Sequence, residues 1–149
     1  MLHLSRIVIV FVALFSSACS GAIDTPTSPS SATGSTALTV SQVSGSWKLT
    51  YLQEADQPGQ PAPAGASYGL TFADGRASVR ADCNVCGGAV TASDQSIVIG
   101  PALACTRAAC PTMAFETLYE RLLSGESQPT VSGSVLTLSS PRGTLIFNR

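Results

Sequence analysis

The stretch 68-YGLTFADGRASVRA-81 decides the fold, because it joins two alternating patterns through a tight turn. Tyr68, Leu70 and Phe72 recur at every second position, which places their side chains on one face of a β-strand. Asp74-Gly75 follows, and a glycine at this point of a two-residue turn adopts positive φ at little cost. The residues after the turn can return as the antiparallel partner. The stretch therefore predicts a β-hairpin with one apolar face.

The same signals recur outward from this hairpin in both directions. Upstream, Trp47, Leu49 and Tyr51 alternate with polar residues and predict the apolar face of another strand. Residues 53–65 are rich in Pro, Gly and Ala, and predict a long surface loop. Further short strands are expected at 89–91, 96–99, 131, 135–138 and 144–147, with turns at Asp94-Gln95, Ser132-Gly133 and Arg142-Gly143. This spacing favours a mainly β fold, either an antiparallel meander or a small barrel.

One helix is expected to interrupt the strands and to pack on the sheet. Pro111 suits a first helical position, and Gly125 stands where a C-terminal cap belongs. The apolar stripe between them has the spacing i, i+3, i+4 and i+7, which we interpret as core packing rather than a binding groove. It consists of Phe115, Leu118, Tyr119 and Leu122.

The N-terminal residues predict export and a lipid anchor. Residues 1–18 have the three parts of a secretory signal peptide, with an apolar run from Ile7 to Phe15 and small residues before Cys19. The run is roughly half of the ~20 residues that a membrane-spanning helix needs. Cleavage before Cys19 is typical of bacterial lipoproteins, in which lipid on this cysteine binds the membrane. Ordinary cleavage, giving a soluble secreted protein, is the alternative.

The rest of the chain divides into a spacer and one domain. Residues 19–40 are read as the lipid-anchored N-terminus and a Ser/Thr/Pro-rich linker, whose composition buries too little apolar surface to fold. Residues 41–149 are read as the folded domain. Ser20 directly after the cysteine favours the outer membrane, facing the periplasm or the cell surface.

The composition of the mature chain argues against several kinds of function. Signal removal takes away His3, the only histidine, and leaves Lys48 and six arginines against nine acidic residues, a net charge of minus two. The sequence has no cluster of basic residues that could bind along the phosphates of a nucleic acid. Without histidine, the common nucleophile–base pairs and the commonest metal ligand are missing. We therefore expect no enzyme, no cofactor, no metal and no nucleic acid. The remaining carboxylates are expected in solvent or in turns rather than as an acid/base pair, notably Asp56, Asp74, Asp94, Glu116 and Glu120.

Four cysteines lie inside the folded region, and their spacing permits three interpretations. A four-thiolate zinc site and a redox-active C-x-x-C are two of them. An oxidising compartment favours the third, two disulfides. Three pairings are possible, and two antiparallel segments most simply nest Cys83 with Cys110 and Cys86 with Cys105. In the chain-entropy model, a disulfide that closes either loop stabilises the folded state by about 3 to 4 kcal/mol.

Several short motifs follow one another in a characteristic order between residues 47 and 147. They are Trp47-x-Leu49, Leu70-Thr71-Phe72 before Gly75, Cys83-Asn84 before Gly87-Gly88, Ile99-Gly100, Thr106-x-x-x-Cys110 with Met113 and Glu116 behind it, and Leu136-Thr137-Leu138. Together they resemble the META domain, also called the HslJ-like family. The departures are Asp82 where glycine is common, Ala89 where an aromatic is common, and the additional Cys86 and Cys105, which suggest a second disulfide.

The resemblance implies a compact antiparallel barrel-like fold with one helix, in envelope proteins that are often lipoproteins. It also implies links to heat shock, antibiotic tolerance and virulence, without an established enzymatic activity. We therefore expect a non-catalytic envelope lipoprotein that binds an unidentified envelope protein or other component.

Two alternative functions remain open on the sequence. One is a carrier of a small apolar ligand in a lipocalin-like barrel whose mouth is lined by Trp47, Tyr51 and Tyr68. The other is the thiol-redox or zinc protein described above. Asn84 and Arg107, beside the cysteines, are either exposed polar contacts or side chains that bond loop backbone.

Overall fold

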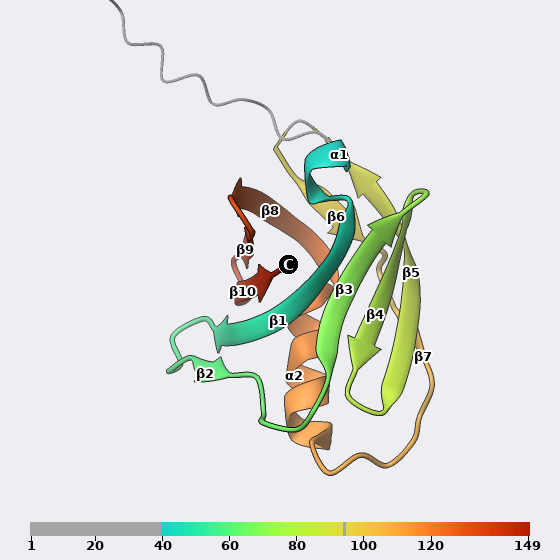
Figure 1. The fold of residues 1–149 in the computed structure, drawn as a ribbon, viewed down its shortest axis with the longest axis vertical. Coiled ribbons are helices and arrows are strands. Elements are labelled where there is room, and N and C mark those ends of the chain that lie inside the picture. Colours follow the sequence, from blue (N-terminus) through green and yellow to red (C-terminus); the bar gives the residue numbers. More distant parts are fainter. Residues whose placement is uncertain (1–39, 94) are drawn as a thin grey trace, which may run out of the picture. The chain divides into compact units, whose positions relative to one another are not determined.

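The computed structural model describes residues 40–93 and 95–149. The predicted signal peptide, Cys19, the linker up to residue 39 and Asp94 of the predicted Asp94-Gln95 turn therefore lie outside the described residues. Within them, eight antiparallel strands form a closed barrel (Figure 1). They are β1 (Gly45–Glu54), β3 (Tyr68–Ala73), β4 (Arg76–Ala81), β5 (Asn84–Ala92), β6 (Ile97–Ile99), β8 (Gly125–Ser132), β9 (Val135–Ser140) and β10 (Gly143–Asn148).

Strand pairing runs around the barrel in the order β1-β3-β4-β5-β6-β8-β9-β10, and β10 pairs with β1 to close it. Closure leaves no unpaired sheet edge in this ring, which removes the main route to edge-to-edge association. Two additional strands of two residues lie outside it. These are β2 (Gln60–Pro61), which pairs with β1, and β7 (Ala104–Cys105), which pairs with β5. The predicted loop at 53–65 is therefore interrupted by β2.

The hairpin predicted from residues 68–81 is confirmed as β3 and β4. Ala73 pairs with Arg76, so Asp74 and Gly75 alone form the turn. Their φ values are 50° and 69°, the conformation of a turn with positive φ at both central residues. The mainly β barrel that the sequence favoured is confirmed as well.

The apolar face of β1 differs from the prediction because the strand contains a bulge. Trp47 and Leu49 face inward as expected, but the register with β10 shifts between Leu49 and Tyr51. The extra residue, Thr50, turns the rest of the strand over. Leu52 is fully buried in consequence, whereas Tyr51 is only partly buried.

The interior of the barrel is filled by side chains. Inward-facing residues from seven of the eight ring strands belong to one buried cluster. The eighth strand, β8, adds the buried Ser127 and Pro129 and the partly buried Val131, which packs against the cluster. A barrel of eight strands has an interior just wide enough for side chains to fill. The main members of the cluster are Leu49, Leu52, Leu70, Val79, Ile99, Leu136, Leu138, Leu145 and Phe147.

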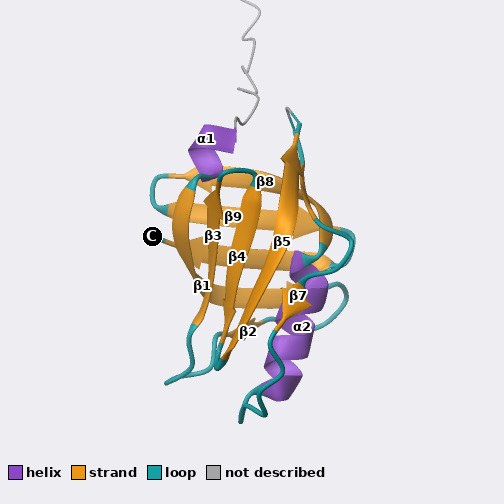
Figure 2. Cartoon of the chain, turned by 90° about the vertical axis from the view of Figure 1, so that its right-hand side faces the viewer, coloured by secondary structure: helices purple, strands orange, loops and turns teal. Residues whose placement is uncertain are grey.

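Two helices complete the described chain, α1 (Val40–Val43) and α2 (Met113–Leu123), and they lie at opposite ends of the barrel (Figure 2). Neither has the length and apolarity that crossing a bilayer requires. The inner face of α2 packs against β1, β4 and β10. Phe115, Tyr119 and Leu122 are buried there as predicted, while Leu118 is partly buried.

The first residue of α2 is Met113, so the prediction that Pro111 begins the helix is wrong. Thr112 occupies the N-cap position with φ −102° and ψ 24°, and its side chain makes no capping hydrogen bond. The hydroxyl of Thr112 instead donates to Asp82 at 2.5 Å and accepts from the Tyr68 hydroxyl at 2.8 Å. These contacts and the neighbouring Cys110 disulfide hold the segment outside the helix. At the other end, Gly125 follows the C-cap with φ 88°, as its predicted role requires.

Candidate functional site

The four cysteines lie where β5 and β7 meet the segment that leads into α2. They come within disulfide distance as two pairs, Cys83 with Cys110 and Cys86 with Cys105. This is the nested arrangement that the spacing favoured. Cys86 and Cys105 are direct partners in the β5–β7 ladder, so their bond links adjacent strands. The two sulfurs and a carboxylate oxygen of Glu120 lie close enough together to hold a metal ion. The sulfurs are bonded to each other in a disulfide, however, and are not free thiolates.

Asn84 organises the loop between the two disulfides. Its side-chain nitrogen donates to the carbonyl oxygen of Ala108 at 2.9 Å and to Glu116 at 2.8 Å. Its oxygen accepts from the Ala108 N–H and the Thr106 hydroxyl, each at 2.8 Å. Asn84 is 1% exposed, so it is a buried structural residue that bonds loop backbone and not an exposed contact.

Glu116 is buried on the inner side of α2, which contradicts the prediction that it is solvated. One of its oxygens accepts from Asn84, and the other is buried with no partner among the described residues. A hollow of about 130 Å³ opens beside it, lined also by Arg107 and Met113. Asp56 and Asp74, in contrast, occupy turns with positive φ as expected.

Glu120 lies one helical turn beyond Glu116 and touches the second disulfide. Its Oε1 is 3.4 Å from Cys86 Sγ, and its Oε2 is 3.5 Å from Arg107 Nη1. Burial raises the pKa of Glu120 above its usual value; Arg107 opposes this and Glu116 adds to it. The side chain of Arg107 is 74% exposed, so Arg107 reaches Glu120 from the solvent side and does not bond loop backbone in these contacts.

Asp82 is one departure from the motif pattern, because glycine is common at this position. Its φ is 55°, in the region that glycine adopts most easily. An aspartate is tolerated there because short polar side chains form local hydrogen bonds. In this structure the carboxylate accepts the hydrogen bond from Thr112 that fixes the start of α2.

A basic groove crosses the outer face of β1, β3 and β4. In one row across the strands, Lys48 pairs with Asn148 on one side and Gly69 on the other, and Gly69 pairs with Arg80. Because Gly69 has no side chain, the row has a depression between the two cations. The groove measures about 430 Å³ and includes Arg149, which stacks over the Trp47 ring at 4.0 Å.

The cations of this groove have no acidic partner among the described residues. Arg107 and Arg121 form ion pairs with Glu120 and Glu54. No such pair is found within the described residues for Lys48, Arg80 or Arg149, nor for Arg76 farther along the same strand face. The sequence did not identify this surface, because its cations are distant in the chain.

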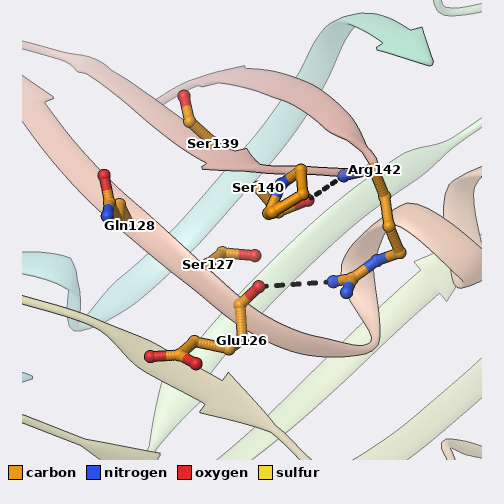
Figure 3. Close-up of a pocket in the computed structure, with 7 residues that line it drawn as sticks. Glu126, Ser127, Gln128, Ser139, Ser140 and Arg142 are labelled. Carbon is orange, nitrogen blue, oxygen red and sulfur yellow. Dashed lines mark hydrogen bonds between the residues drawn. The ribbon is translucent and has the colours of Figure 1, made fainter. Parts of the chain in front are cut away.

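A larger hollow of about 640 Å³ lies between β8 and β9, where their ladder ends (Figure 3). Arg142 reaches across it and donates to the carbonyl oxygens of Ser124 at 2.6 Å and Glu126 at 3.3 Å. Ser124 is the C-cap of α2, so Arg142 satisfies a carbonyl group at the helix terminus. We interpret this arginine as structural.

The barrel is similar to solved structures of other proteins. One is an NMR structure of a protein from Burkholderia xenovorans, which is 25% identical to this chain and has a TM-score of 0.62. The match covers 74% of this chain and 85% of the Burkholderia protein. A second NMR structure with 20% identity, covering 74% of this chain and 94% of its own, has the same fold with a TM-score of 0.56. No curated protein matches the chain. The sequence profile of the META domain matches residues 37–149, which include all described helices and strands. This chain therefore belongs to the META domain family.

Proposed function

We propose that this META domain protein is a non-catalytic binding module of the bacterial cell envelope. In this proposal lipid on Cys19 holds it at a membrane, and the basic groove takes an anionic, phosphate-bearing component of the same membrane. The groove cations that have no acidic partner among the described residues, above all Lys48 and Arg80, carry the proposal. They gather on one face of a chain whose net charge after signal removal is minus two.

The geometry of the groove suits a phosphate group. Neighbouring strands lie about 4.8 Å apart, so the backbones of Lys48 and Arg80, two strands apart, are separated by about 10 Å. Their long side chains are able to converge on one anion above Gly69. Arginine offers two parallel N–H groups to a phosphate and lysine a point charge. Small polar residues beside the row, such as Ser46 and Thr71, leave the approach open.

The packing of the barrel supports an apolar-ligand carrier less well. Two of the three aromatic residues proposed for a barrel mouth, Trp47 and Tyr68, are 2% and 3% exposed and belong to the core. Tyr51 lies after the bulge and is not part of that cluster. A ligand in the interior would have to displace packed side chains, at a cost of several kcal/mol.

The absence of catalysis is part of the proposal. It rests on the sequence of the mature chain, which has no histidine and no nucleophile–base pair. The links of the family to stress and antibiotic tolerance fit a protein that supports the envelope by binding. We propose this role without assigning the stress.

The proposal is tested by vesicle binding of the domain without its lipid. We expect the wild-type domain to bind phosphatidylglycerol-containing vesicles and not pure phosphatidylcholine vesicles, with salt weakening the binding. Replacing two groove cations, Lys48→Glu with Arg80→Glu, should lower the partition coefficient about tenfold or more, because each basic residue near an anionic surface contributes about 1 kcal/mol.

The matched control is the double variant Arg107→Glu with Arg121→Glu, which changes the net charge equally at two cations outside the groove. It should retain most of the binding. Equal losses in the two double variants would mean that net charge alone drives association. No binding of the wild-type domain to anionic vesicles would contradict the proposed ligand.

A further inference from the structure

The Cys86–Cys105 disulfide is surrounded by groups that thiol–disulfide exchange requires. We propose that this bond is an exchange site for an external dithiol, in which Glu120 gives the proton to the Cys86 sulfur as the bond breaks. This is a second function, independent of the groove. It differs from the C-x-x-C hypothesis, because the two cysteines belong to different strands.

Accessibility decides which sulfur is attacked. Cys86 is 2% exposed, whereas Cys105 on the short outer strand β7 is only partly buried. An incoming thiolate therefore reaches Cys105 Sγ, and Cys86 is the leaving group. The leaving thiolate would be buried, where an unpaired negative charge is costly.

Glu120 removes that cost by protonating the leaving sulfur. Its Oε1 is already 3.4 Å from Cys86 Sγ. The charged groups that face it are Arg107, from the segment between β7 and α2, and Glu116, from α2 itself. Burial and Glu116 favour the protonated form of Glu120, and Arg107 draws the carboxylate back to the charged form once the proton has left.

The reaction balances as two successive displacements. In the first, a thiolate of the dithiol bonds to Cys105 Sγ, the S–S electron pair passes to Cys86 Sγ, and the proton of Glu120 converts Cys86 to a thiol. In the second, the other thiol of the dithiol loses its proton and attacks the dithiol sulfur that is bonded to Cys105. The electron pair of that S–S bond passes to Cys105 Sγ, which takes up the proton. The dithiol is oxidised to a disulfide, and the protein disulfide is reduced to two thiols.

The Cys83–Cys110 disulfide provides an internal comparison. The group beside Cys110 Sγ is the Asn84 amide nitrogen at 3.3 Å, which does not release a proton in this pH range. Cys83 is exposed, so a thiolate also reaches this pair, and the leaving sulfur is that of Cys110, which is 6% exposed. Cys110 has no contact with Glu120 among those found in the described residues, so the two disulfides differ in the proton donor and not in access. After reduction of the other pair, this disulfide still links the turn between β4 and β5 to the segment before α2.

The experiment measures the reduction rate of each disulfide by dithiothreitol, with rapid alkylation and peptide mass analysis. Rates are divided by the thiolate concentration, from about pH 5 to about pH 8. For Cys86–Cys105 this corrected rate should fall as pH rises and Glu120 loses its proton. In the variant Glu120→Gln the rate should be lower by about tenfold or more at the acidic end, and it should be flat with pH.

Two controls separate proton donation from a structural effect. Glu126→Gln changes an exposed carboxylate outside the cluster and should behave as wild type. The corrected rate for Cys83–Cys110 should be unaffected by Glu120→Gln in the same molecules, which shows that the variant remains folded. The same pH profile in wild type and Glu120→Gln would overturn the proposal. So would an equally steep fall with pH of the corrected rate for Cys83–Cys110 in the wild-type domain, because that pair has no contact with Glu120.

Discussion

Single residues in this protein hold the loops to the barrel through buried polar contacts. Asn84 is the main example, because its one amide serves Ala108, Thr106 and Glu116 at once. A buried polar group that loses its partner costs more than the hydrogen bond contributes in the native state. Removing Asn84 would leave a backbone carbonyl and a buried carboxylate without a donor.

We therefore expect Asn84→Ala to lower the free energy of unfolding by about 3 kcal/mol. Urea denaturation of the domain with both disulfides intact measures the change. Asn148→Ala, at an exposed position on β10, is the control and should change stability by no more than about 0.5 kcal/mol. A loss below about 1 kcal/mol for Asn84→Ala would mean that the loop satisfies these groups in another way.

Among the elements, α2 depends on Tyr119 for its position on the barrel. The Tyr119 ring is fully buried, and its hydroxyl donates to the carbonyl oxygen of Gly69 at 3.0 Å. It lies 5.5 Å from the Tyr68 ring and 6.3 Å from the Phe147 ring, measured between centroids. The pair with Tyr68 is edge to face, an arrangement that contributes beyond the area it buries.

The pKa of Tyr119 is raised far above its usual value by burial, with a smaller effect from Tyr68. The unfolded chain therefore loses this proton at a lower pH than the folded protein does. Stability linked to Tyr119 is complete below about pH 10 and decreases above it, by at most about 1.4 kcal/mol per pH unit. Tyr119→Phe should lower stability by about 1 kcal/mol at neutral pH and reduce the alkaline slope by up to one proton.

Urea titrations between about pH 8 and about pH 11 measure this slope. Tyr51→Phe is the control, because the ring of Tyr51 on β1 lies against Gly59, in the connection from β1 to β2, and Tyr51 is not part of the buried core. An unchanged slope in Tyr119→Phe would show that the hydroxyl opens to solvent before the domain unfolds.

Helices and strands were predictable from the sequence where interactions between neighbouring residues decide them. The hairpin at Asp74-Gly75 follows from turn chemistry and alternation, and both were legible in the sequence. The start of α2 was not, because contacts from Asp82 and Tyr68 to Thr112 decide it. Strand β8 was recognised only at Val131, because its composition includes Pro129 and polar residues that its neighbours in the barrel hold in place.

For the whole molecule, the proposed anchor determines where the barrel works. We expect Cys19→Ala to move the protein from the membrane fraction to the soluble fraction of the envelope, because one residue carries the lipid. Intact mass should show an acylated N-terminal Cys19 in the wild type only. The variant Ser20→Ala keeps the cysteine and should remain in the membrane fraction. An unmodified wild-type protein in the soluble fraction would favour the secreted alternative.

The sequence by itself determined the strand pattern, the hairpin turn, the stripe of α2 and the family, because alternation, glycine conformation and short motifs act between near neighbours. Tertiary structure alone decided the bulge at Thr50, whose hydroxyl bonds the carbonyl oxygen of Ile146 across 96 positions. It also decided the burial of Glu116, the contact of Glu120 with Cys86, and the meeting of Lys48, Arg80 and Arg149 in one groove. These features arise from closing the barrel, which fixes the register of strands that are distant in the chain and places their side chains beside one another.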